Sequence, residues 1–196
     1  AAWIADVDGD MSASAGEGQP VPHLTATRIV RTPQDSLDVS FNWWISDSPS
    51  RDFGPRHIKD YRDFKTGGFG TPEGDANKYH VLSNGEFDYD QVFASMMAQG
   101  DSIWIPIGRE LADRVSTGED TRYLLSFGPF AIDPGQTLPL SFAYIAGANL
   151  HNENLPDNYQ NLPDQPGAFY ANLDFSDLAK NSKWASAVYD NPGVDT

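Results

Sequence analysis

The chain has 196 residues, of which 39% are hydrophobic and 12% aromatic, so it can bury one substantial core, unlike a disordered acidic chain. Its 13 Lys and Arg stand against 28 Asp and Glu, and the net charge of -15 disfavours nucleic acid and anionic lipid surfaces as partners. The absence of cysteine excludes disulfides, thiolate metal sites and a cysteine nucleophile, and no apolar run approaches the roughly 20 residues that membrane insertion requires.

Residues 1–23 are rich in Gly, Ser, Ala and Asp and show no sustained periodicity, so we expect an extended N-terminal arm. The chain opens with Ala1-Ala2 rather than Met, which fits a processed or excised end. Together with the acidity, this favours an extracellular or cell-surface protein over a cytoplasmic one.

An acidic motif, "DVDGDMSASAGE", lies inside this arm. Calcium loops of the EF-hand type place oxygen ligands at alternate positions and end on a bidentate acid. The matching residues are Asp6, Asp8, Asp10, Ser12 and Glu17. However, Met11 stands where such loops need Gly, and no convincing helix flanks the segment. The motif is therefore either a calcium site or a solvated acidic arm.

Two strands are predicted next. "LTATRIVR", residues 24–31, is rich in β-formers, and "SLDVSFNWWIS", residues 36–46, alternates between apolar and polar positions. Trp44 falls on the polar side of that alternation. It is either covered by a loop or exposed as a binding platform.

The segment from Pro49 to Asp75 is rich in Gly, Pro, Arg and Asp and predicts a long loop, the most plausible face for a partner. Asn84-Gly85 then lies between β-prone runs and predicts a hairpin turn. "DYDQVFASMMAQG", residues 88–100, has the spacing of a helix, and "DSIWIPIG", residues 101–108, that of an edge strand.

The segment "DTRYLLSFGPFAIDPGQTLPLSFAYIAG", residues 120–147, predicts two strands and a type II turn at Asp133-Pro134-Gly135-Gln136. Its return strand is expected to point inward with the alternating residues Leu138, Leu140, Phe142, Tyr144 and Ala146. A polar loop follows, and "FSDLAKNSKWASAVYDNPG", residues 175–193, predicts a terminal helix that ends at a turn.

These elements predict a mainly β protein: a two-sheet antiparallel β-sandwich, jelly-roll or immunoglobulin-like, with two short helices and long loops. We expect residues 1–23 to form the arm and residues 24–196 a single sandwich domain with a C-terminal helix.

Four phrases carry a resemblance: "SFNWWIS", "GTPEGDANKYHVLSNGEFDYDQVF", "LLSFGPFAIDPGQTLPLSFAYIAG" and "VYDNPGVDT". They resemble a module of large, uncharacterised secreted or cell-surface bacterial multidomain proteins. The resemblance implies a multidomain surface context, with Asp195-Thr196 as a truncation or processing point. It brings no active site with it.

The leading hypothesis is a non-catalytic structural or adhesive β-sandwich module of a cell-surface or filamentous assembly, stabilised by calcium if the acidic motif binds it. Its partners would be protein neighbours or a glycan. The stretch "AAWIAD" can dock on its own domain or add to an edge strand of a neighbour, which would give a homo-oligomer through the arm.

Two alternatives remain open. In a carbohydrate-binding module, the stacking residues would be Trp44, Tyr61, Phe69 and Tyr170. In a polysaccharide hydrolase, Glu86 and Asp88 would serve as paired carboxylates, although an acid here can equally cap the following helix.

Overall fold

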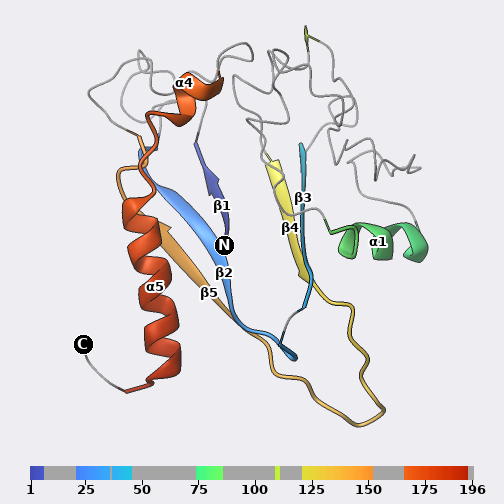
Figure 1. Ribbon diagram of the computed structural model, residues 1–196. Helices are drawn as coiled ribbons and strands as arrows, with labels where there is room; N and C mark the ends of the chain where they lie inside the picture. The colour runs from blue at the N-terminus through green and yellow to red at the C-terminus, as the bar shows by residue number, and fades with distance from the viewer. Residues whose placement is uncertain are drawn as a thin grey trace. The chain divides into compact units, whose positions relative to one another are not determined.

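The computed structural model describes residues 1–6, 21–35, 37–45, 74–85, 109–110, 121–151 and 166–193. The chain divides into two compact units, one built from residues 1–36, 131–160 and 167–196, the other from 37–130 and 161–166. Each unit holds one small antiparallel sheet, so the fold is mixed, with two sheets and a long C-terminal helix (Figure 1).

The first unit contains a three-stranded sheet of order β1-β2-β5. Strand β2 (Leu24–Arg31) confirms the predicted strand and lies in the middle, between β1 (Ala2–Ala5) and β5 (Ser141–Gly147). Both neighbours run antiparallel to β2, and the register against β5 shifts between Ile29 and Arg31. Part of the expected arm is therefore an edge strand of its own unit.

Helix α5 (Ser176–Asp190) packs along one face of this sheet and confirms the predicted terminal helix (Figure 1). The core between helix and sheet is formed by buried residues that are all apolar: Leu24, Ala26, Leu150 and Leu178. Trp3 and Phe175 close one end of this core edge to face, with ring centroids 5.2 Å apart. Burial of this apolar surface supplies the main stabilisation of the unit.

The helix approaches the sheet most closely at Gly147, the last residue of β5. A Cβ atom at this position would lie 2.7 Å from Leu24 Cδ2 and 2.8 Å from Leu178 Cβ. It would also lie 2.9 Å from the backbone nitrogen of Leu178. Only glycine leaves room for the helix backbone at this distance, because real Cβ atoms do not approach backbone atoms so closely.

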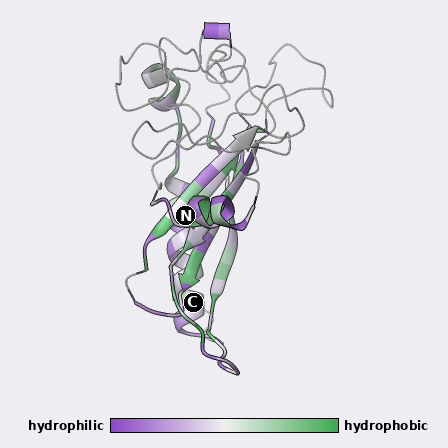
Figure 2. Ribbon diagram, turned by 90° about the vertical axis from the view of Figure 1, so that its right-hand side faces the viewer, coloured by the Kyte–Doolittle hydropathy of each residue, from purple (hydrophilic) through white to green (hydrophobic). Residues whose placement is uncertain are grey.

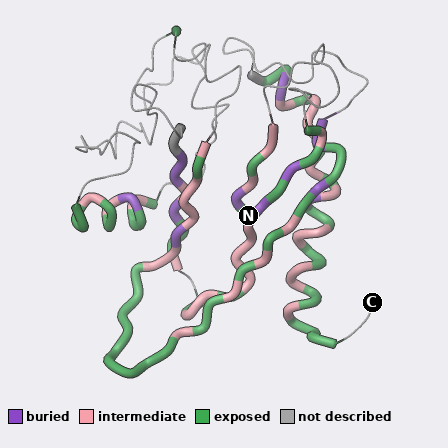
Figure 3. Tube along the Cα trace, turned by 180° about the vertical axis from the view of Figure 1, so that it is seen from behind, coloured by how far each residue is buried: buried purple, intermediate pink, exposed green. Residues whose placement is uncertain are grey.

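The predicted inward face of β5 is wrong. Phe142 and Tyr144 are 52% and 79% exposed, whereas Ala143 and Ile145 are half-buried and Gly147 is buried (Figure 3). Successive side chains of a strand point to opposite faces, so the contact of Gly147 with α5 turns Ile145 and Ala143 toward the helix as well. The larger aromatic residues consequently occupy the opposite face.

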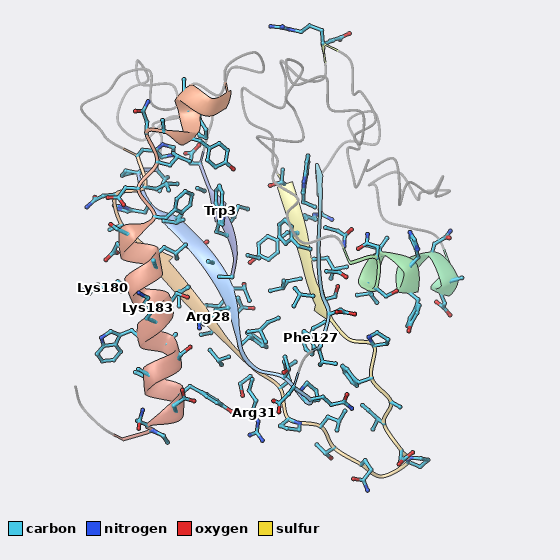
Figure 4. All side chains as sticks on the ribbon, viewed as in Figure 1. Trp3, Arg28, Arg31, Phe127, Lys180 and Lys183 are labelled. Atoms are coloured by element: carbon cyan, nitrogen blue, oxygen red, sulfur yellow. The ribbon has the colours of Figure 1, made fainter. Side chains whose placement is uncertain are left out.

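Polar contacts fasten the far end of α5 to the strands. Arg28 of β2 donates to Ser182 Oγ, and Figure 4 shows this arginine between strand and helix. Ser141 Oγ lies 3.4 Å from the Tyr189 hydroxyl and donates to it. This hydrogen bond, followed by one from Arg31, lowers the pKa of Tyr189 because both stabilise the phenolate. The helix is thus held at both ends.

The second unit contains a two-stranded antiparallel sheet, β3 (Val39–Ile45) and β4 (Thr121–Phe127). One face carries the apolar and aromatic residues of the predicted alternation, among them Phe41, Trp43, Tyr123 and Leu125. Trp43 is 3% exposed, and the rings of Phe41 and Tyr123 lie 5.8 Å apart. The predicted strand at residues 36–46 is therefore confirmed.

The other face of this sheet carries buried polar residues, namely Ser40, Asn42 and Ser126. Asn42 Nδ2 donates to the carbonyl of Val81 at 2.9 Å, and Ser126 Oγ donates to the carbonyl of Leu82 at 2.9 Å. Both carbonyls belong to the last turn of helix α1 (Asp75–Leu82), where carbonyls lack partners within the helix. The strand side chains therefore cap the helix, which explains why they are buried.

The predicted β-hairpin around Asn84-Gly85 is wrong on its N-terminal side, because residues 75–82 form α1 rather than a strand. This helix contains both hydrophobic and hydrophilic residues (Figure 2). Asn84 Nδ2 donates to Asn42 Oδ1 at 2.7 Å, and the Gly85 amide donates to Ser40 Oγ at 3.0 Å. Both residues thus close the helix onto the sheet, and Gly85 has the positive φ that the turn signal required.

The turn at residues 133–136 is confirmed. The Gln136 amide donates to the Asp133 carbonyl at 3.0 Å, and Gly135 has a φ of 81°. However, the strands before and after it do not pair with each other, because β4 joins β3 and β5 joins β2. Local turn chemistry does not by itself determine which strands pair.

Replacing Gly147 with Ala should force α5 away from the sheet and lower the free energy of unfolding by about 1–3 kcal/mol, as overpacked cores do. The matched control is Gly167→Ala in α4 (Pro166–Tyr170), where nothing lies within 4 Å of the new Cβ. It should keep or raise the stability. Urea unfolding of both variants measures this; equal effects would contradict the close approach at Gly147.

Candidate functional site

The best-defined polar junction of the described chain lies at the end of β1. The Asp6 carboxylate accepts a hydrogen bond from the Val21 amide at 2.9 Å, and the Asp6 carbonyl lies 2.7 Å from His151 Nε2. Ala5 pairs with Leu24 in the adjacent sheet register. Asp6 and Val21, which flank the acidic residues 7–20 in the sequence, are therefore held side by side.

His151 is the buried side chain at this junction, with 1% of its surface exposed. Because the Asp6 carbonyl can only accept, Nε2 of the imidazole carries a proton and donates it. His151 also forms an isolated antiparallel bridge with Leu173, and its ring lies 6.0 Å from that of Phe169. It thereby joins the β1 end, the segment after β5 and the segment before α5.

Burial lowers the pKa of His151, because a charged imidazolium is poorly solvated there. The hydrogen bond to the Asp6 carbonyl and the negative charge of Asp6 oppose this effect but do not cancel it. The neutral form is therefore favoured in the folded protein. A buried neutral imidazole that donates to a carbonyl acts here as a structural link.

The surrounding backbone is held in a similar way. The Leu150 amide donates to the Pro22 carbonyl at 2.7 Å, and the Asp174 amide donates to the Leu150 carbonyl at 2.8 Å. The Asn149 amide donates to His23 Nδ1 at 3.2 Å. Asn149 has a φ of 57°, a conformation that Asn tolerates better than most residues. These hydrogen bonds hold residues 149–150, which follow β5, against residues 22–23, which precede β2.

The first turn of α5 secures the end of β5. Asp177 Oδ2 accepts from the Ala148 amide at 2.9 Å, and Asn181 Nδ2 donates to the Ala146 carbonyl at 2.8 Å. Asn181 also donates to Asp177 Oδ2 at 3.2 Å. An acid in the first turn also suits the helix dipole. Both side chains therefore bind the backbone at the outer edge of the strand.

Only one of the expected calcium ligands, Asp6, lies among the described residues, and its carboxylate binds Val21. Asp8, Asp10, Ser12 and Glu17 lie outside them. In the described part of the chain, no group of three or more His, Asp or Glu side chains is placed to hold a metal ion. The calcium site thus stays a prediction.

The expected glycan-binding residues are only partly described. Tyr170 lies in α4, half-buried, with its ring 6.2 Å from Phe169 in an edge-to-face contact. Trp44 lies in β3 opposite Arg122, but its side chain is outside the described part, as are Tyr61 and Phe69. The proposed carboxylate pair, Glu86 and Asp88, is outside it as well. The glycan-binding site and the carboxylate pair both stay predictions.

Sequence reasoning missed the role of His151. It was one of four dispersed histidines without metal-ligand spacing, and its partner Asp6 is 145 positions away. No local pattern signals such a contact. It arises because β1 and β5 both pair antiparallel with β2, which brings the residues after β1 and after β5 to the same end of the sheet.

Comparisons with protein-family models, with curated proteins and with solved structures found no match to the chain. Among the described helices, none combines the length and the apolar character needed to cross a membrane. The function is therefore argued from the geometry and from the sequence itself.

The lowered pKa of His151 predicts a pH-dependent stability. At neutral pH the imidazole is neutral in both states. As pH falls through the unfolded-state pKa of about 6.5, the unfolded chain binds the proton first, so stability falls until the lower folded-state pKa is passed. Urea unfolding between pH 7.5 and 5 should show this loss in the wild type and a smaller one in His151→Gln. Equal losses would contradict the assignment.

Proposed function

We propose that the chain is a non-catalytic structural or adhesive β module of an extracellular or cell-surface assembly. The proposal rests on the hydrogen bonds that buried polar side chains make to the backbone. Asn42, Ser126 and His151 all donate to backbone carbonyls. Side chains committed in this way fix the fold, which suits a protein whose task is to hold its shape.

The module is proposed to be a two-sheet sandwich. Each sheet has one face toward a helix and a second face that carries apolar residues, and such faces are stable only when they are covered. The chain also passes from one sheet to the other twice, between β2 and β3 and between β4 and β5. Alternation of this kind is typical of sandwiches with Greek-key connections.

The Gly147→Ala variant supplies a second readout for this proposal. If the two sheets form one cooperative sandwich, loosening α5 should accelerate amide hydrogen exchange in β3 and β4 by the same factor as in β2. Exchange that rises in β2 alone would show independent units and would reject the sandwich. Gly167→Ala again serves as the control, since it should leave all three strands unchanged.

The proposed surface location is supported by the acidity of the chain. The resemblance to modules of secreted or cell-surface bacterial proteins is itself proposed, from the four sequence phrases alone. A net charge of -15 keeps such a module soluble and away from anionic lipid. The arm can still link neighbours by exchanging β1 between copies, although the structure pairs this strand with its own β2.

Calcium is proposed as the ligand of the acidic segment. The Asp6 carboxylate and the Val21 amide, which flank residues 7–20, are hydrogen-bonded, and the acidic residues of that segment lie close together in sequence. Carboxylate and hydroxyl oxygens are the ligands that calcium prefers. Binding would neutralise part of the local negative charge and stabilise the connection between β1 and β2.

Metal analysis and thermal unfolding test the calcium proposal. Calcium at about 100 times its Kd should stabilise the protein by about 2.7 kcal/mol, and a chelator should reverse this. The double variant Asp8→Asn with Asp10→Asn should lose the effect, whereas the control Asp133→Asn, in the exposed turn, should retain it. Asp6 is unsuitable as the test because its carboxylate also binds Val21. No bound metal and an unchanged melting temperature would reject calcium.

The absence of catalysis is tested with a panel of extracellular polysaccharides. We expect no release of reducing ends by the wild type, because the proposed role needs no turnover. Turnover that disappears in Glu86→Gln while the melting temperature stays unchanged would reject the proposal in favour of a hydrolase with paired carboxylates. A glycan array carried out with the wild type and Trp44→Ala separates adhesion to sugars from adhesion to proteins.

A further inference from the structure

Strand β5 has the properties of an edge that can accept another strand. Within the described part of the chain it ends the sheet, with β2 on its other side. Its seven residues, Ser141–Gly147, include no charged residue and no proline. Natural edge strands usually carry such residues because they discourage pairing with other chains.

The direction of the backbone groups of β5 follows from its contacts with α5. The Ala146 carbonyl and the Ala148 amide both turn to the outer edge, where Asn181 and Asp177 bind them. In an antiparallel ladder, backbone groups alternate between the two neighbours. Tyr144 and Phe142, two and four residues before Ala146, therefore point their N–H and C=O groups to the same outer edge.

The side chains of the same two residues are the large exposed hydrophobic side chains of the strand. Tyr144 and Phe142 contact each other edge to face, with ring centroids 5.4 Å apart. They lie beside Thr27 and Ile29 of β2, on the face opposite α5. Outward backbone groups and exposed aromatic rings thus coincide at Phe142 and Tyr144.

We propose that this edge binds a second copy of the chain by antiparallel pairing of β5 with β5, around a two-fold axis at Ala143. Phe142 then lies opposite Tyr144 of the partner subunit, and each such pair exchanges both N–H···O bonds. Because the register is symmetric, the same residues face each other from both sides. Four aromatic rings meet across the axis on one face of a continuous six-stranded sheet.

Features at both ends of β5 limit the paired region to its centre. At one end, Asp177 and Asn181 occupy the outer backbone groups of Ala148 and Ala146. At the other end, β5 begins at Ser141, so Phe142 is the first residue of the strand whose backbone groups point outward. Among the described residues, the open outward groups of β5 are thus those of Phe142 and Tyr144, and this selects the register centred on Ala143.

A second copy fits this edge better than a partner of other chemistry. The strand offers no charge for an acidic or basic peptide, whereas its open groups are complementary to themselves. The short paired region falls below the roughly 1,200 Å² of stable interfaces, so the pairing is weak, in the micromolar to millimolar range. The charge of -15 on each copy opposes it, so added salt strengthens it. The inference does not depend on the proposed function.

Sedimentation equilibrium of the full chain up to about 1 mM tests the proposal, at low and at physiological salt. The wild type should form dimers, and more of them at higher salt. Tyr144→Thr, which keeps a β-former, and Phe142→Lys, which places a charge at the edge, should each weaken dimerisation at least about tenfold. The melting temperature of each monomer is measured alongside, and dimerisation that weakens while the melting temperature stays the same assigns the loss to the β5 edge.

The matched control is Trp184→Ala, which removes an exposed aromatic side chain from the outer face of α5. It should leave dimerisation unchanged. A wild type that stays monomeric, or dimers that respond to Trp184→Ala but not to the two β5 variants, would overturn the proposal. A ladder of larger species would also overturn it, because pairing of β5 with β1 of the next copy gives an open chain instead of a closed dimer.

Hydrogen exchange supplies a direct measure of the paired groups. The amides of Phe142 and Tyr144 should exchange rapidly in dilute protein and slowly in concentrated protein. The amide of Ala143, which points to β2, should show no such dependence. Concentration-independent exchange at Phe142 and Tyr144 would reject pairing at this edge even if the protein dimerises.

Discussion

The first unit depends on the close approach of α5 to the end of β5. Gly147 allows the backbone of the helix to lie at a distance that any side chain would prevent. This contact sets the orientation of the whole strand, because Ile145 and Ala143 must face the helix on the same side as Gly147. The large aromatic residues are left on the opposite face, and the first turn of the helix reaches the outer edge of the strand.

In both units, hydrogen bonds from polar side chains to the backbone add to the apolar packing. In the second unit, Asn42 and Ser126 satisfy the last carbonyls of α1, so a polar strand face can be buried. Buried polar groups need such partners, because an unpaired group costs about 1–3 kcal/mol. In the first unit, Asp177 and Asn181 bind exposed backbone groups at the end of β5. The role of these side chains is therefore structural rather than chemical.

The junction of Asp6 with His151 links the stability of the fold to the acidic segment. Its hydrogen bonds connect Asp6, at the end of β1, to His151, which follows β5, and to Val21, the first described residue after the acidic segment. Anything that binds this segment in the folded state would stabilise the sheet through the same junction. Protonation of His151 would weaken it, because the buried site disfavours the charged imidazole.

Local signals in the sequence determined the strands β2 and β3, the helix α5 and the turn at residues 133–136, because periodicity, propensity and turn chemistry depend on near neighbours. They did not determine which strands pair, which face of β5 is inward, or that residues 75–82 form a helix. Those outcomes depend on contacts between distant residues: Gly147 with Leu178, Asn42 with Val81, and Asp6 with His151. For β5 the larger side chains favoured the wrong face, because the space beside α5 admits only small residues at its tightest point.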